Sequence, residues 1–519
     1  MISAETLVEL LLAVVLLAGF AQLVSVPYPV VLVLGGAALG FLPGPTQVRL
    51  DPEVVLFVFL PPLLYSAAFL SSPAELRANA RPIFLLAVGR VIATMLAVAA
   101  CAHVVLDLDW ALGLVLGAIV SPTDPVAATS ILRRLGAPRR VAVILEGDAL
   151  VNDGSGLVLY KLALGAVAGT TLSLPAAGGD FVLVAAGGAA VGLAAGWLSA
   201  LVRRSFEEPR IEITISILTP FAAYIPASRL GLSGVLAAVA AGLYVSHQSA
   251  AILSAETRLR YYAFWEVVTF LLNAILFLLV GLQLRAILEN VTSGETVRLL
   301  LEGVLISVVV IAIRLVWMFT VAPLTDLLPG PSIARDWRER IVFGWSGMRG
   351  AVSLAAALAL PLTVSHRDQL IVVTFVVIVV TLVLPGLTLP ALITGLGLRG
   401  EESVAEQAPA ARETLARAAL ARLDELGAGR SDEELADLRA LYEARLRRLA
   451  GQRPDYANLR LEAIAAERAA LAELRAGGLA DEVARKLEHD LDLEEARARP
   501  PAAPAPVPPA RPRPGRVSR

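Results

Sequence analysis

The chain consists largely of long apolar runs separated by short polar stretches. An apolar run of about twenty residues, wound as a helix, crosses a hydrocarbon core of ~30 Å. The runs do not alternate between apolar and polar positions, which favours helices over a membrane β-barrel. We therefore predict an all-α polytopic membrane protein with about thirteen transmembrane helices, at residues 4–25, 27–43, 53–70, 81–105, 109–132, 139–167, 179–202, 211–226, 231–246, 262–284, 298–325, 340–362 and 368–393.

Charged residues are concentrated near the carboxyl end. They make up 17% of the whole chain, yet residues 399–519 hold 43 of the 90. A water-soluble surface needs about a quarter charged residues, so residues 1–398 lack the polar cover of an aqueous domain. We expect a transmembrane domain at 1–398, a cytoplasmic helical regulatory tail at 399–495 and a disordered extension at 496–519. The extension contains eight prolines and six arginines, a composition that does not suit a packed core.

The arginines in the predicted loops indicate the orientation. With the N-terminus outside, the cytoplasmic loops carry fourteen arginines and the outer loops five. The positive-inside rule then places the polar tail in the cytoplasm, and we expect a multi-pass protein of the inner (plasma) membrane. A single cysteine, Cys101, excludes a cysteine-based metal centre. The net charge of -2 argues against nucleic acid as a partner, and no motif points to a resident cofactor or to an enzyme.

Two of the predicted spans contain residues that break helices. In the fifth span Pro122 and Pro125 bracket Asp124, and a proline removes a backbone donor from the helix. In the twelfth span, FGWSGMRGAVSLA places three glycines around Arg349. We expect Asp124 to balance exposed amides or to bind a cation, and Arg349 to cap exposed carbonyls. The interrupted spans are seven apart and therefore run in opposite directions, which is typical of two inverted six-helix repeats, spans 1–6 and 8–13.

The sixth span carries three acids in a short stretch of hydrophobic helix. They are Glu146, Asp148 and Asp153, within LEGDALVNDGSG. Three carboxylates cannot all stay charged there without partners, so some must be protonated, cation-bound or ion-paired. Arg314, deep in the eleventh span, is the basic partner that we expect. This chemistry suits a site where protons and cations compete.

Two other charged residues lie inside apolar runs. Arg90 is in the fourth span and Glu266 is in the tenth. We expect Arg90 to extend toward the membrane surface or to pair with Glu266. Glu146 and Glu266 are secondary candidates for the ion site.

Taken together, these segments resemble the monovalent cation–proton antiporters of the NhaP/NHE branch, in their bacterial form with a helical cytoplasmic tail. The resemblance covers roughly residues 20–400 and is strongest in SPTDP, LEGDALVNDGSG and GMRGAVSLA. It implies exchange of Na⁺ (or Li⁺, or K⁺) for H⁺ by a homodimer. It also implies that the fifth and twelfth spans unwind and cross near the ion site.

The resemblance further implies roles for individual residues. Asp153 matches the carrier carboxylate for which a cation and a proton compete. Asn152 matches the residue that goes with electroneutral exchange of one ion for one proton. Asp124 and Thr123 match the TDP motif. With Asp153 they are the expected ligands of Na⁺.

Asp148 and Arg314 match a supporting ion pair of the same family. Three residues depart from the family's pattern: Asp148 replaces the usual Glu, Ala149 a frequent Ser, and Pro385 a common Gln. Because Asp is one methylene shorter than Glu, a water can replace the direct contact with Arg314. These departures bear on ion preference and affinity more than on exchange itself.

Three other functions are alternatives for a polytopic membrane chain of this kind. A cation channel would pass ions without proton counterflow. An organic-anion/proton symporter would need a larger pocket with free half-helix N-termini, which the acid-rich sixth span disfavours. A membrane enzyme is disfavoured because the serine-type GWSG sequence at 344–347 lacks a base: the later histidine of the membrane domain, His366, is expected in an outer loop.

Overall fold

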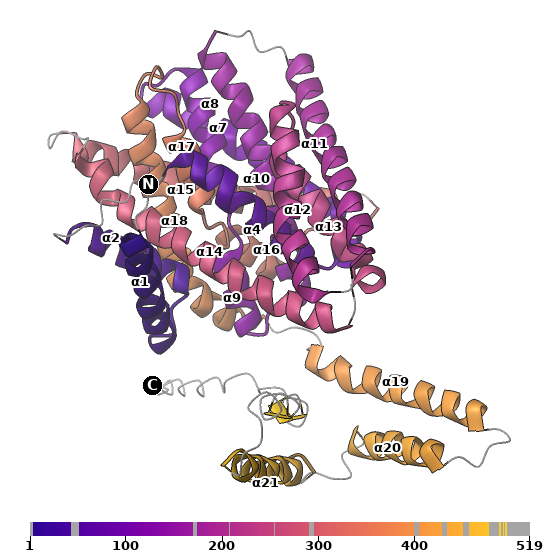
Figure 1. Ribbon diagram of the computed structural model, residues 1–519. Coiled ribbons are helices and arrows are strands. Elements are labelled where there is room, and N and C mark those ends of the chain that lie inside the picture. Colours follow the sequence, from indigo (N-terminus) through magenta and orange to yellow (C-terminus); the bar gives the residue numbers. More distant parts are fainter. Residues whose placement is uncertain are drawn as a thin grey trace, which may run out of the picture. The chain divides into compact units, whose positions relative to one another are not determined.

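Helices form all the regular structure in the described part of the chain. The computed structural model describes residues 4–42, 51–169, 174–206, 208–253, 255–289, 295–327, 329–398, 404–427, 433–449, 456–476, 487–488, 491–492 and 494–495. The chain divides into two units, Met1–Gly400 and Glu401–Arg519. Figure 1 shows the first unit as a bundle of helices.

The first unit has the helix lengths of a multi-pass membrane protein. Eight helices of the described residues are long and apolar enough to cross a membrane: Glu5–Leu23, Pro52–Leu70, Ala80–Val105, Ala177–Arg203, Pro209–Arg229, Thr257–Glu289, Thr296–Thr325 and Arg367–Leu396. Tyr28–Gly40 and Trp110–Val120 are apolar but shorter. The 29-residue helix Arg139–Val167 is not among the eight. It is long enough, but the predicted acidic site lies in its middle.

In chain order the elements of this unit are α1 (Ala4–Leu23), α2 (Tyr28–Gly40), α3 (Pro52–Val54), η1 (Val55–Phe59), α4 (Leu60–Leu70), α5 (Pro73–Ala78), α6 (Ala80–Phe84), η2 (Leu85–Arg90), α7 (Val91–Val105), α8 (Trp110–Val120), α9 (Val126–Arg134), α10 (Arg139–Val167), α11 (Leu174–Arg203), α12 (Pro209–Arg229), α13 (Gly234–Ile252), α14 (Ala255–Glu289), α15 (Thr296–Asp326), α16 (Trp337–Trp345), α17 (Ala351–Leu358) and α18 (Arg367–Leu396). Here η1 and η2 are π-helical segments within longer helices.

Both spans with helix-breaking residues are divided. α8 ends at Val120 and α9 begins at Val126, so residues 121–125, which contain both prolines, are not helical. α16 ends at Trp345 and α17 begins at Ala351, and residues 346–350 between them contain two glycines. Backbone amides and carbonyls are therefore released from helical hydrogen bonds inside the bundle, where water does not satisfy them.

Glycines allow several helices to approach closely. A Cβ atom on Gly36 of α2 would collide with the carbonyl oxygen of Leu278 in α14. A Cβ atom on Gly192 of α11 would collide with the carbonyl oxygen of Ala237 in α13. These two helix pairs pack backbone against backbone, as is usual where small residues line membrane helix interfaces.

Within its described residues the second unit has the helices α19 (Val404–Gly427), α20 (Glu433–Leu449) and α21 (Tyr456–Ala476). Arg439 of α20 forms an ion pair with Asp424 of α19 at 3.1 Å. The sequences of these helices have the amphipathic pattern expected of the tail. The extension at 496–519, which the sequence predicts to be disordered, lies outside the described residues.

Candidate functional site

The two interrupted spans meet through their backbones. The amide of Asp124 donates a 2.8 Å hydrogen bond to the carbonyl oxygen of Met348. The Oδ1 atom of Asp124 accepts a 2.9 Å hydrogen bond from the amide of Val126, the first residue of α9. Asp124 therefore satisfies one amide with its carboxylate and one carbonyl with its own N–H. Gly350 lies so close that a Cβ atom there would collide with the Asp124 carboxylate.

Arg349 binds carbonyls on both sides of this crossing. Its side chain is fully buried. The Nε atom donates a 3.0 Å hydrogen bond to the carbonyl oxygen of Val120, the last residue of α8. One of its Nη atoms donates to the carbonyl oxygen of Gly347. The C-terminal end of a helix carries partial negative charge, so a guanidinium there is stabilising.

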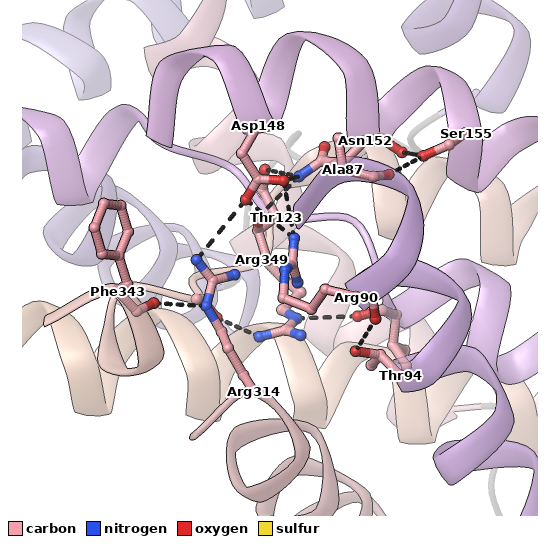
Figure 2. A network of polar contacts seen from close by, with 12 residues as sticks. Ala87, Arg90, Thr94, Thr123, Asp148, Asn152, Ser155, Arg314, Phe343 and Arg349 are labelled. Atoms are coloured by element: carbon pink, nitrogen blue, oxygen red, sulfur yellow. Dashed lines mark hydrogen bonds and ion pairs between the residues drawn. The ribbon is translucent and has the colours of Figure 1, made fainter. Parts of the chain in front are cut away.

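Asp148 is the acceptor at the centre of a buried polar cluster (Figure 2). The Nη2 atom of Arg90 donates to both of its carboxylate oxygens, at 3.1 and 3.0 Å. The Nη2 atom of Arg314 lies 3.9 Å from Oδ2, and its Nε atom donates a 2.8 Å hydrogen bond to the carbonyl oxygen of Phe343. The expected ion pair with Arg314 is thus present at a longer distance, and Arg90 is the closer partner.

The finding for Arg90 corrects an expectation. The sequence led us to expect that Arg90 extends to the membrane surface or pairs with Glu266. Instead it is fully buried and bound to Asp148, whereas Glu266 is exposed on α14. A guanidinium at this depth needs an acceptor because an isolated buried charge is costly, and here the carboxylate of Asp148 is that acceptor.

Asn152 connects this cluster to the interruption after α8. Its Nδ2 atom donates to the hydroxyl of Thr123 at 2.9 Å and to the carbonyl oxygen of Thr123 at 3.3 Å. The same nitrogen lies 3.4 Å from Oδ1 of Asp148. Its amide oxygen is buried and has no hydrogen-bond partner within the described residues. Asn152 is therefore oriented by its nitrogen, and its oxygen is available to another group.

Asp153 is partly buried on α10, next to Asn152 in the chain. Its side chain makes no hydrogen bond or ion pair with any described residue. The negative charges of Asp124 and Asp148 repel the carboxylate of Asp153. A carboxylate in this setting is stabilised by whatever neutralises it, either a proton or a cation.

The structure does not bring the two secondary candidates into this group. Glu146 pairs with Arg133 at 2.6 Å, and the Arg133 side chain is 70% exposed. Glu266 is exposed on the outer face of α14. Sequence reasoning did not single out Ser155, whose hydroxyl donates to the carbonyl oxygen of Ala87 in η2. The only available signal was its place within the acid-rich segment.

The described residues contain no group of three or more His, Cys, Asp and Glu side chains placed to hold a metal ion. The atoms near the crossing that suit a hard monovalent cation are oxygens: the carboxylates of Asp153 and Asp124 and the hydroxyl and carbonyl of Thr123. A ligand set with only two carboxylates suits a transported ion, which binds and dissociates, better than a permanently bound ion.

Comparison with known proteins gives a consistent result. Residues 10–395 match the family described as "Sodium/hydrogen exchanger, transmembrane". A protein of Mycobacterium tuberculosis named as a Na(+)/H(+) exchanger is 35% identical over 504 residues, which cover 91% of this chain and 92% of the relative. The Na(+)/H(+) antiporter ApNhaP of Aphanothece halophytica is 31% identical over 386 residues, 73% of this chain and 71% of the relative.

The fold is also similar to a solved structure. The sodium proton antiporter MjNhaP1 from Methanocaldococcus jannaschii, determined at pH 8, superposes with a TM-score of 0.60 at 21% identity. The match covers 75% of this chain and 98% of that one.

Proposed function

Because the chain belongs to the sodium/hydrogen exchanger family, we propose that it exchanges Na⁺, or the related ions Li⁺ and K⁺, for H⁺ across the plasma membrane. Relatives such as ApNhaP are named as Na⁺/H⁺ antiporters, and they match this chain over most of the membrane unit. The proposed carrier is Asp153, with Asp124 and Thr123 as the other cation ligands.

The observation that carries the proposal is the hydrogen bond between Asp124 and Met348, which joins the two interrupted spans directly after Thr123. Irregular backbone inside a membrane protein is tolerated where it is buried or lines an ion pathway. Interrupted helices that meet at mid-membrane are the usual setting for ion sites in transporters. Here the same interrupted segment supplies both the backbone carbonyl of Thr123 and the side-chain carboxylate of Asp124.

With Asp153 as a single carrier, the proposed exchange is one for one. Three arginines and three aspartates lie in or next to the cluster, and they cancel when all are ionised: Arg90, Arg314, Arg349, Asp124, Asp148 and Asp153. Adding one Na⁺ or one proton at Asp153 gives the same net charge of one positive unit. A carrier that moves with either ion then moves equal charge in both directions, so no net charge is transferred per cycle.

The proposed topology has thirteen spans with the N-terminus outside and the tail in the cytoplasm. In this count α8 with α9, and α16 with α17, each form one interrupted span, while α3 to α4 and α6 to α7 are single spans with π-helical segments. The two six-span repeats would be inverted relative to one another. Alternating access by rocking of the repeats, within a homodimer, completes the proposed mechanism.

Proton flux in everted vesicles tests the proposal. Vesicles that contain the protein are acidified, a pH-sensitive dye reports the gradient, and pulses of Na⁺, Li⁺ and K⁺ are added in turn. We expect Na⁺ to collapse the pH gradient, and vesicles without the protein to show no response. A lack of response to all three cations would contradict the proposal. Uptake of Na⁺ without proton counterflow would indicate a channel.

A further inference from the structure

We propose that Arg90 is a positioning residue for ion exchange: it holds Asp148, and through Asp148 it orients the Asn152–Thr123 contact beside the carrier. This inference rests on the proposed function. Arg90 touches none of the proposed cation ligands directly. Its hydrogen-bond partner Asp148 also lies 3.4 Å from Asn152, whose nitrogen binds the hydroxyl of Thr123.

The first support is the geometry at Asp148. One nitrogen of Arg90 reaches both carboxylate oxygens within 3.1 Å, and neither side chain is exposed. The nearest nitrogen of Arg314 is 3.9 Å from the carboxylate, and the Nε atom of Arg314 donates its hydrogen bond to the carbonyl oxygen of Phe343. Hydrogen bonds between ionised groups are the strong ones. Arg90 therefore fixes the position of Asp148 more than Arg314 does.

The second support is the segment that carries Arg90. Arg90 is the last residue of the π-helical segment η2, a type of element that is frequent at functional sites. The hydroxyl of Ser155 on α10 donates to the carbonyl oxygen of Ala87 in η2. The hydroxyl of Thr94 donates to the carbonyl oxygen of Arg90 itself at 2.8 Å. Polar contacts therefore join η2 to α10 on both sides of Asp153, at Asp148 and at Ser155.

The third support is the contact that Asp148 makes in turn. Asp148 and Asn152 are one helical turn apart on α10, and Asn152 directly precedes the carrier. With its nitrogen held by Thr123 and directed toward Asp148, Asn152 has an amide oxygen without a hydrogen-bond partner among the residues that the structure describes. If Asp148 moves, the amide of Asn152 loses one of its three contacts, and Thr123 alone then holds it. The series of contacts from Arg90 through Asp148 and Asn152 to Thr123 is thus continuous.

Transport kinetics separate positioning from simple stabilisation. In proteoliposomes, Na⁺-driven proton flux is measured against Na⁺ concentration and normalised to correctly folded protein. Removing an outer contact of an ion site typically costs roughly 10- to 100-fold in affinity or activity. We expect Arg90→Gln to raise the KM for Na⁺ by this factor. Arg90→Lys, which keeps one charged nitrogen for the carboxylate, should recover most of the affinity.

A double variant tests whether Arg90 acts through Asp148. If it does, Arg90→Gln should change the KM little in a chain that already carries Asp148→Asn. The double variant removes both members of the Arg90–Asp148 pair and leaves Arg314 without its carboxylate, which is one stranded charge fewer than in Asp148→Asn alone. Arg90→Lys keeps the pair, so it provides a measurement even if Arg90→Gln does not fold. Effects that multiply in the double variant would overturn the proposal.

Arg203→Gln is the matched control. Arg203 is as buried as Arg90, but its contacts are Tyr65, Thr219 and the ring of Tyr261, outside the Asp148 cluster. We expect it to affect stability and to leave the KM for Na⁺ unchanged. An unchanged or lowered KM in Arg90→Gln would overturn the positioning role while leaving exchange by the parent chain intact. Absence of exchange in the parent chain would instead contradict the proposed function.

Discussion

The amide of Asp124 donates a 2.8 Å hydrogen bond to the carbonyl oxygen of Met348. Each atom was released by an interruption in its own span, and each satisfies the other. An unpaired buried N–H or C=O is costly, and no water is available in the hydrocarbon region to replace the missing partner. The two interruptions are therefore mutually dependent, and a change in either one should alter the geometry of the proposed ion site.

Gly350→Ala should disturb this contact. The new Cβ atom would lie 2.9 Å from Cβ of Asp124 and closer still to its carboxylate, so one of the two segments must shift. Overpacking of this kind typically costs ~1–3 kcal/mol. We expect a lower melting temperature in detergent together with reduced Na⁺-driven proton flux. Gly395→Ala in α18 is the control, because nothing lies within 4 Å of its added Cβ atom. Equal behaviour of the two variants would count against the close packing at Asp124.

Asp153→Asn should abolish exchange at every pH without loss of stability. Asparagine keeps the size of the side chain but neither releases a proton nor neutralises a cation. The side chain of Asp153 has no hydrogen-bond or ion-pair partner among the described residues, and the negative charges of Asp124 and Asp148 repel its carboxylate. The melting temperature should accordingly be unchanged or higher. Dye dequenching in everted vesicles and a thermal scan of the same preparation test both points. Substantial Na⁺-driven proton flux by this variant would exclude Asp153 as the carrier.

The interruptions could be predicted from the sequence, whereas the partner of Asp148 could not. Pro122 and Pro125 break a helix for a local reason, the missing N–H, so no knowledge of the neighbours was needed. Whether Arg90 or Arg314 reaches Asp148 depends on which face each helix turns toward α10. Each residue rotates a helix by about 100°, so the π-helical segment η2 changes the face on which Arg90 lies. The residue pattern of the fourth span does not predict the π-helical segment η2.

Asp148→Ala should be more destabilising than Arg314→Ala. Loss of Asp148 leaves Arg90 and Arg314 without the carboxylate they share, while loss of Arg314 leaves Asp148 bound to Arg90. An orphaned buried charge costs ~3–5 kcal/mol in soluble proteins and less in a bilayer. We expect Asp148→Ala to lower the melting temperature in detergent more than Arg314→Ala does.

Further variants check the cause of this order. The double variant Asp148→Ala, Arg314→Ala should recover part of the loss because one fewer charge is stranded. Arg133→Ala is the control, since its pair with Glu146 lies at the surface and such pairs contribute little. Strictly additive losses in the double variant would mean that Asp148 and Arg314 do not interact.

Transport should not depend on membrane potential. The six charged side chains in and around the cluster cancel, and the carrier gains one positive charge from either Na⁺ or a proton, so a complete cycle moves no net charge. Proteoliposomes with equal pH gradients and potentials of opposite sign, imposed with an ionophore, should show equal rates of Na⁺ uptake. The protein should also generate no potential when a Na⁺ gradient alone drives it. A rate that rises steadily with voltage would mean that more than one proton moves per Na⁺. Asp124 would then be the next residue to test as a second proton carrier, because it lies at the crossing and is only partly buried.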